Sequence, residues 1–76
     1  ERLIFLRNLI ASSELDGAEY YMKRGAYLAA VNRANYVLKN IPNSTERERA
    51  LRILKEAYKQ LGYDEYAEKI SSFETN

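Results

Sequence analysis

Apolar residues recur at helical spacing along most of the chain, in four segments separated by turn-forming residues. No segment shows the strict alternation of apolar and polar residues that marks a half-buried strand. The four segments cover approximately residues 3–24, 27–40, 44–61 and 64–74. The pattern therefore predicts an all-α fold of four helices that pair as two antiparallel hairpins.

The first predicted helix carries more apolar surface than a hairpin of this size can cover. One face holds residues at helical spacing, which are Leu3, Leu6, Ile10, Ser13, Gly17 and Tyr21. Three more apolar residues widen this surface at the start of the helix, namely Ile4, Phe5 and Leu9. The excess indicates a further neighbour, either an upstream segment of a longer chain or a second copy in a homodimer.

Each of the other predicted helices has one apolar face. In the second helix it consists of Tyr27, Ala30, Val31, Ala34, Val37, Leu38 and Ile41. In the third it consists of Ala50, Leu51, Ile53, Leu54, Ala57, Tyr58 and Leu61, and in the fourth of Ala67, Ile70 and Phe73. The many alanines favour close approach of neighbouring helices.

Glycine and proline mark the predicted helix ends. Gly25 and Gly62 suit the left-handed backbone conformation that often follows the last turn of a helix. Lys23 and Arg24 suit the negative end of the first helix dipole. Pro42 ends the second helix in a turn.

Polar residues predict two helix starts. Thr45 and Glu48 have the spacing of a capping box, so we expect the third helix to begin at residue 44 or 45. Asp64 is expected to cap the fourth helix in the same way, by accepting a hydrogen bond from a free backbone N–H group.

The two hairpins repeat one another with a period of 37 residues. Recurrence of a helix–turn–helix unit is the signature of an α-solenoid, so we predict repeat one over residues 3–42 and a partial, capping repeat over residues 44–74. In each repeat a tyrosine fills the space between the helices, a glycine makes the turn and an alanine permits close packing. The predicted structural core is therefore Tyr21, Gly25, Ala30, Tyr58, Gly62 and Ala67.

Composition excludes several classes of function. The 76 residues hold 12 basic and 11 acidic side chains, whereas nucleic-acid-binding modules usually have a one-sided basic excess. The chain has neither Cys nor His, so it lacks the thiolate and imidazole metal ligands and the commonest general base. We therefore expect no enzymatic activity, no cofactor and no metal. No apolar run is long enough to span a bilayer.

Two charged clusters have a functional and a simpler interpretation. The first holds Glu14, Asp16 and Glu19. Metal sites built from oxygen ligands usually need a shaped loop, so a solvated or partner-facing surface is favoured over a metal site. The second holds residues 46–49 (ERER), Arg52, Lys55 and Lys59. Its glutamates dilute a possible phosphate-binding strip, and a solvated helix face is favoured.

The repeated positions resemble the tetratricopeptide motif, in which a small residue, an aromatic, a glycine, an alanine and a closing proline follow at fixed spacings. In the first unit these places hold Ala18, Tyr21, Gly25, Ala30 and Pro42. The second unit has Leu51, Leu54, Tyr58, Gly62 and Ala67, and ends before its proline. Glu14 replaces the usual tryptophan and Ala34 an aromatic, which points to a particular subfamily.

That subfamily is indicated by the string AEYYMKRGAYLAAVNRANYVLKNIPNS, residues 18–44. The string closely resembles the C-terminal repeats of the BamD (ComL) family of outer-membrane assembly lipoproteins. The resemblance implies a protein on the periplasmic side of the bacterial outer membrane, with its lipid anchor outside these residues. It also implies a docking scaffold that contacts the POTRA domains of a BamA-like subunit and a small BamE-like lipoprotein.

The expected partner-facing surface lies on the second helix and the turn before it. If Ala30, Ala34 and Val37 point inward, the opposite face presents an arginine and an aromatic, which are typical interface anchors. An arginine can hold a carboxylate through two parallel hydrogen bonds. The predicted partner-binding residues are Arg24, Asn32, Arg33, Tyr36 and Asn40.

Simpler alternatives stay open for the arginines and for the function. In the simpler interpretation neither arginine meets a partner. Arg24 then only neutralises the negative end of the helix dipole, and Arg33 only pairs with an acidic residue of this chain. The alternative function is a generic tetratricopeptide adaptor, which binds a peptide in a concave groove lined by Lys and Asn.

Overall fold

The computed structural model describes residues 2–74 of the chain and the side chains of residues 2–72. Its helices are α1 (Arg2–Lys23), α2 (Tyr27–Asn40), α3 (Arg47–Gln60) and α4 (Asp64–Glu74). No strand occurs among these described residues, so the predicted all-α fold is confirmed. The bounds of α2 are those that the sequence predicts.

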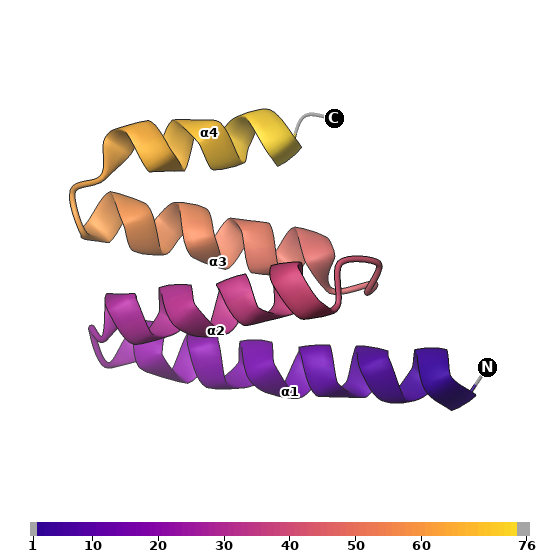
Figure 1. Ribbon diagram of the computed structural model, residues 1–76. Helices are drawn as coiled ribbons and strands as arrows, with labels where there is room; N and C mark the ends of the chain where they lie inside the picture. The colour runs from indigo at the N-terminus through magenta and orange to yellow at the C-terminus, as the bar shows by residue number, and fades with distance from the viewer. Residues whose placement is uncertain (1, 75–76) are drawn as a thin grey trace.

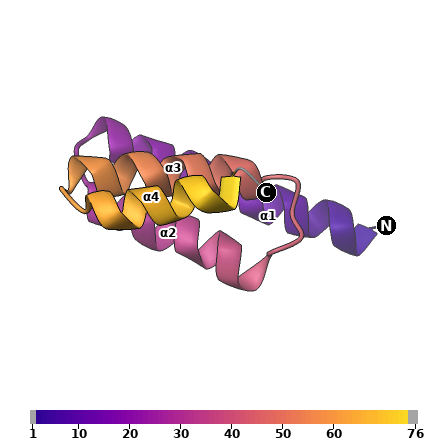
Figure 2. The ribbon, with the colours of Figure 1, turned by 90° about the horizontal axis from the view of Figure 1, so that it is seen from above.

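The four helices lie side by side in chain order, and each runs antiparallel to the one before it (Figure 1). α2 packs against both α1 and α3, α3 also touches α1, and α4 packs against α3. The molecule measures 40 × 29 × 14 Å along its principal axes, so it is a slab in which every helix keeps an exposed face. The first turns of α1 project beyond the other helices (Figure 2).

Glycine forms the turn after α1, as predicted. Gly25 has a φ of 80°, a left-handed conformation that a Cβ atom disfavours. The backbone N–H of Ala26 donates to the carbonyl of Tyr21 at 2.9 Å, and that of Gly25 donates to the carbonyl of Met22 at 3.1 Å. This pair of bonds is a Schellman motif, which satisfies carbonyl groups that the end of a helix leaves free.

The turn after α3 repeats this geometry. Gly62 has a φ of 85°. The backbone N–H of Tyr63 donates to the carbonyl of Tyr58 at 2.8 Å, and that of Gly62 donates to the carbonyl of Lys59 at 3.1 Å. The sequence period therefore coincides with a recurring backbone motif, because equivalent residues make equivalent hydrogen bonds in both hairpins.

The start of α3 differs from the prediction. The helix begins after Glu46, whose side chain makes no capping hydrogen bond. The hydroxyl of Ser44 accepts a hydrogen bond from the N–H of Glu46 at 2.8 Å, and the N–H of Thr45 donates to the side-chain carbonyl of Asn8 at 3.2 Å. The predicted capping box between Thr45 and Glu48 is wrong, because Ser44 and a residue of α1 hold this loop instead.

The start of α4 differs in a smaller way. Asp64 is the first residue of the helix instead of the capping residue before it. The position before the helix is taken by Tyr63, whose carbonyl accepts a hydrogen bond from the N–H of Ala67 at 3.1 Å. Asp64 and Glu65 lie in the first turn, where a negative charge is favourable next to the positive end of the helix dipole.

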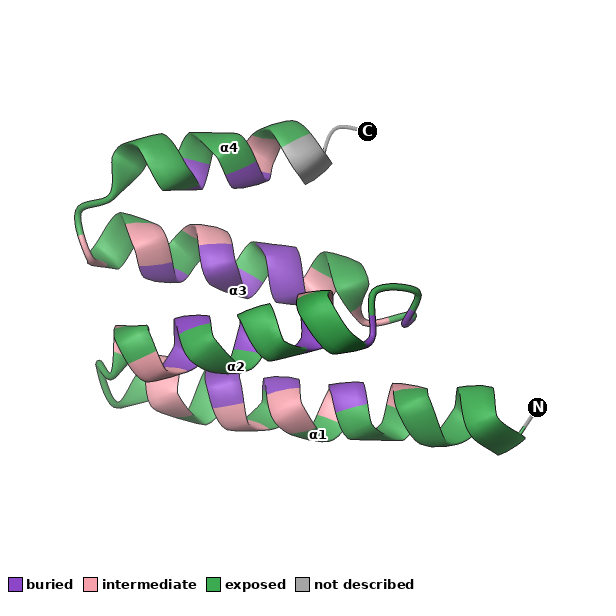
Figure 3. Cartoon of the chain, viewed as in Figure 1, coloured by how far each residue is buried: buried purple, intermediate pink, exposed green. Residues whose placement is uncertain are grey.

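Buried residues lie along the facing sides of the helices (Figure 3), and the alanines among them permit close approach beside leucine, isoleucine and valine. The buried residues of α2 and α3 were all predicted, and they are Ala30, Val31, Ala34, Val37, Ala50, Leu51, Ile53, Leu54 and Ala57. Ala67 and Ile70 of α4 are buried as predicted, whereas the side chain of Phe73 lies outside those described.

The buried residues of α1 are different from those of the apolar face that its sequence shows. Its buried residues are Ala11, Leu15 and Ala18. That apolar face is open or only partly covered, with Leu3, Leu6, Ile10 and Ser13 exposed and Gly17 and Tyr21 intermediate. This exposure agrees with the expectation that the hairpin cannot cover all of the apolar surface, because its large residues lie at the start of α1, which extends beyond the end of α2 (Figure 1). α2 packs instead where alanines permit a close approach.

Large apolar side chains remain uncovered in the first turns of α1. Leu3, Ile4 and Phe5 are 62%, 64% and 66% exposed, and Leu6, Leu9 and Ile10 are about half exposed. We call residues 2–10 the apolar extension of α1. Single exposed apolar residues are common on protein surfaces, but a cluster of this kind usually marks a contact surface. The excess of apolar surface that the sequence predicts for this helix is therefore present. Even so, none of the described helices has the length and apolarity that crossing a membrane requires.

The six residues predicted as structural core play different parts. The buried ones are Ala30 and Ala67. Tyr21 and Tyr58 are partly covered, and both pack against the core. Gly25 and Gly62 are exposed in the two turns, so their description as core residues needs correction. Their contribution is the backbone conformation that the turns require.

Candidate partner-binding site

Two arginines and two tyrosines form a continuous patch beside the α1–α2 turn. The guanidinium of Arg24 lies 5.2 Å from the ring centroid of Tyr20, and that of Arg33 lies 5.7 Å from the ring centroid of Tyr21. The two rings meet edge to face, with their centroids 5.8 Å apart. We call these four residues the arginine–tyrosine patch, in which each arginine rests on one of two contacting rings.

The hairpin explains why these residues meet. Tyr20 and Tyr21 lie in the last turns of α1, and the Schellman turn then reverses the chain. This reversal brings Arg33 of α2 back alongside the end of α1. Sequence reasoning placed both arginines in one patch but missed Tyr20, which gives Arg24 its support. The adjacent tyrosines in the sequence were the signal available.

Arg33 also binds an acidic residue of its own chain. Its Nη1 atom lies 2.7 Å from Oε2 and 3.1 Å from Oε1 of Glu14 on α1. The hydrogen bonds to this carboxylate raise the pKa of Arg33. The intrachain pair considered as the simpler alternative is thus present. The arginine nevertheless remains accessible, because its side chain is 45% exposed whereas that of Glu14 is 21% exposed.

The remaining predicted partner-binding residues lie along the exposed face of α2. Asn32, Tyr36 and Asn40 are all exposed, and the side chain of Asn40 donates a hydrogen bond to the carbonyl of Tyr36 at 3.0 Å. Tyr36 is three residues from Arg33, so the two side chains are neighbours on the helix surface. The structure therefore links Arg24 and Arg33 through the rings of Tyr20 and Tyr21. The other predicted residues continue the exposed surface along α2.

A second charged cluster, centred on Arg49, was missed by sequence reasoning. Arg49 of α3 donates hydrogen bonds to Asp16 at 2.6 Å and to Glu19 at 3.0 Å, both on α1. It also donates to Glu46 at 3.0 Å. These bonds raise the pKa of Arg49, and the bond from Arg49 lowers the pKa of Glu19. Arg49 therefore joins the two hairpins and is more than part of a solvated charged face.

These ion pairs account for the acidic residues of α1. Glu14 faces Arg33, while Asp16 and Glu19 face Arg49. Within the part of the chain that the structure describes, no three carboxylates gather into a potential metal site. The cluster is thus organised by arginines from two different helices.

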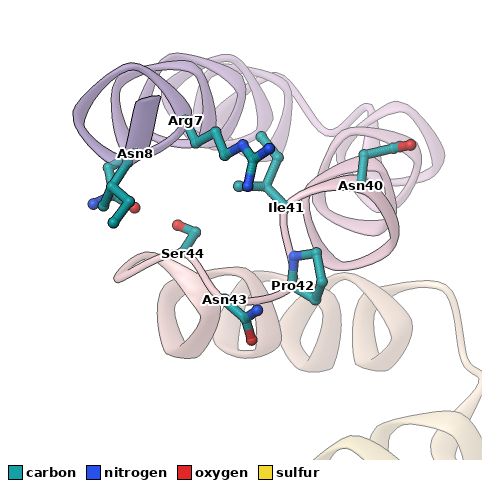
Figure 4. Close-up of a pocket in the computed structure, with 8 residues that line it drawn as sticks. Arg7, Asn8, Asn40, Ile41, Pro42, Asn43 and Ser44 are labelled. Atoms are coloured by element: carbon teal, nitrogen blue, oxygen red, sulfur yellow. The ribbon is translucent and has the colours of Figure 1, made fainter. Parts of the chain in front are cut away.

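A small cavity lies at the other end of the α1–α2 hairpin (Figure 4). It has a volume of about 90 Å³ and lies between the first turns of α1 and the loop before α3. Arg7 is the only charged residue in its lining and points across it towards Ile41. Asn40 also lines this cavity, so one of the predicted partner-binding residues lies away from the arginine–tyrosine patch.

Two consecutive helical hairpins with the same glycine turn, and with an exposed arginine–tyrosine patch, define a tetratricopeptide-like helical-repeat protein. The chain belongs to the family described as YfiO, outer membrane lipoprotein, whose family model matches residues 1–73. The resemblance to the BamD family seen in the sequence is confirmed.

Relatives with the name outer membrane protein assembly factor BamD match most of the chain. The protein of Neisseria meningitidis serogroup A is 41% identical over 66 residues, which cover 87% of this chain and 25% of the relative. That of Neisseria gonorrhoeae is 43% identical over 79% of this chain and 22% of the relative. That of Vibrio cholerae serotype O1 is 35% identical over 90% of this chain and 28% of the relative. The chain thus spans about a quarter of each relative.

Proposed function

We propose that this chain is a protein–protein docking unit of the machinery that assembles outer-membrane proteins. Membership of the YfiO family and the names of its relatives support a role in outer-membrane protein assembly. Within that role, the unit binds the POTRA domains of a BamA-like subunit, and a small BamE-like lipoprotein is a second candidate partner. The unit acts on the periplasmic side of the outer membrane, held by a lipid anchor outside these 76 residues.

The arginine–tyrosine patch is the observation that carries this proposal. Interfaces are anchored by aromatic and arginine side chains, and this patch presents two of each on one hairpin. Each guanidinium rests on a ring, which restricts its motion while its charge stays accessible. A carboxylate on a POTRA domain fits such a surface through paired hydrogen bonds to arginine.

Charge reversal of each arginine tests this assignment. Purified POTRA domains of a BamA-like protein are titrated with the natural chain and with Arg24→Glu and Arg33→Glu variants, and dissociation constants are measured by calorimetry. Reversal of a contacting charge is expected to weaken binding at least tenfold, because the partner carboxylate then meets a like charge. Arg52→Glu is the matched control, since Arg52 is an exposed arginine of α3 that lines a groove with Lys23 and makes none of the ring contacts of the patch. Unchanged affinity in both patch variants rejects the assignment.

The alternative of a peptide-binding adaptor has less support from the surface. A groove of about 310 Å³ lies between α1 and α3, where such an adaptor would hold a peptide. Its lining holds one lysine, and its charged residues are Lys23, Arg49, Arg52, Glu19 and Glu56, with Arg49 already bound to Glu19; no asparagine contributes. This groove therefore lacks the lining of Lys and Asn that would favour capture of a peptide carboxylate.

A further inference from the structure

The contacts of Arg33 are arranged asymmetrically around its guanidinium group. Both hydrogen bonds to Glu14 come from the same nitrogen, Nη1. The ring of Tyr21 supports the guanidinium from a centroid distance of 5.7 Å. Glu14 is the more buried member of the pair, so the arginine is the outer one. Glu14 engages Nη1 alone and the side chain of Arg33 is 45% exposed, so the guanidinium keeps donors for a carboxylate from outside the chain.

We propose that Glu14 and Tyr21 are positioning residues that hold Arg33 ready to bind a partner carboxylate through guanidinium nitrogens that Glu14 does not engage. The proposal rests on the function proposed above and adds two residues to it. Glu14 then assists docking, although its negative charge is the same as that of the incoming group. A bidentate bond needs the guanidinium in one orientation, which Glu14 and Tyr21 fix before the partner arrives.

Glu14 has two opposing effects on affinity: it holds Arg33 in place, and it repels the partner carboxylate. Ordering a long side chain during association weakens affinity by about two- to tenfold, and this loss is avoided when the side chain is already held. Two carboxylates about 7 Å apart in water repel by less than about threefold in affinity. Salt at physiological concentration, with a Debye length of about 8 Å, reduces this repulsion further. Positioning therefore outweighs repulsion at physiological salt when both carboxylates stay in contact with water.

The direction in which one substitution changes the binding affinity tests the proposal. Glu14→Gln removes the charge but keeps the shape, and we expect it to weaken binding to purified POTRA domains about two- to fivefold at physiological salt. At low salt the weakening is expected to shrink, because the removed repulsion is then larger. Asp16→Asn is the matched control, since it removes a charge from the same helix but faces Arg49 instead of Arg33. Its effect on affinity is expected to be below twofold.

Further measurements separate positioning from a general loss of structure. Nitrogen relaxation at Arg33 Nε should show greater mobility in the Glu14→Gln variant, while helicity by circular dichroism stays unchanged. In an Arg33→Ala background, Glu14→Gln should no longer weaken binding. Tyr21→Phe keeps the ring but removes the hydroxyl that also interacts with Arg33, so it should retain more affinity than Tyr21→Leu, which removes both.

The possible failures are distinguishable. If Arg33→Ala weakens binding but Glu14→Gln leaves it unchanged or tightens it, Glu14 does not position Arg33, and the proposed function stands. If Arg33→Ala itself leaves affinity unchanged, Arg33 is no anchor, and both this inference and the assignment of Arg33 in the proposed function fall.

Discussion

Arg49 of α3 lies 2.6 Å from a carboxylate oxygen of Asp16 on α1, which joins the first helix of one hairpin to the first helix of the next. The same guanidinium binds Glu19 and Glu46, so one cation holds two carboxylates of α1 and that of the residue just before α3. Arg49 is only 22% exposed, whereas the carboxylates of Asp16 and Glu19 are about half exposed or more. The two hairpins are therefore tied by charge as well as by their alanine-lined contact.

Replacement of Arg49 by methionine should lower the free energy of unfolding. Exposed ion pairs contribute about 0.2–1 kcal/mol each, so the loss of three partly exposed pairs predicts a decrease of about 1–2 kcal/mol. Urea unfolding followed by circular dichroism measures this change. Arg52→Met is the control, since it alters a nearby exposed arginine of the same helix. Equal stability of both variants would show that the network contributes nothing measurable.

Acid should weaken the same network. The hydrogen bond from Arg49 lowers the pKa of Glu19 from its ordinary value of 4.5. A depressed pKa in the folded state contributes stability that is present above pH 4.5 and is lost as the pH falls through the folded pKa. The urea midpoint of the natural chain should therefore fall between neutral and strongly acidic pH by more than that of Arg49→Met. Parallel curves for the two proteins would contradict this prediction.

The same substitution at two glycines should have opposite effects on stability. Gly25→Ala puts a Cβ at a φ of 80°, which predicts a loss of about 1–2 kcal/mol. Gly17 lies within α1, and a Cβ there meets nothing within 4 Å. Gly17→Ala should therefore stabilise the protein by about 0.5–1 kcal/mol through its better helix propensity. Thermal unfolding compares the two variants, and a shift of the same sign for both would rule out this explanation.

The turns could be predicted because their signals are local in the sequence. The features that were not predicted depend on contacts between residues far apart in the sequence. Gly25 and Gly62 could be placed because a left-handed turn depends on a single residue type. The partners of Arg49 lie 30 and 33 residues away on α1, so their meeting depends on how one hairpin packs on the next. The buried residues of α1 could not be named for a related reason, since periodicity shows where apolar residues lie but not which side a neighbour covers. Arg33 was recognised, but its pairing with Glu14 needed the hairpin geometry.

The apolar extension of α1 should make the isolated chain self-associate. Its leucine, isoleucine and phenylalanine side chains are about half exposed or more, and covering them is favourable by about 25 cal/mol per Å². We propose a homodimer through this surface when no other segment covers it. Sedimentation velocity should show a mass that rises with concentration towards that of a dimer.

Substitution of two residues of the apolar extension by glutamate tests whether this surface causes the self-association. The double variant Phe5→Glu/Leu9→Glu should stay monomeric and keep its helicity, because both side chains are exposed in the single chain. Leu28→Glu is the matched control, since Leu28 is an equally exposed leucine on α2, outside the extension, and its substitution should leave the dimer intact. A natural chain that is monomeric at every concentration would exclude the dimer, and a Leu28→Glu variant that loses self-association would place the contact on α2 instead of the extension.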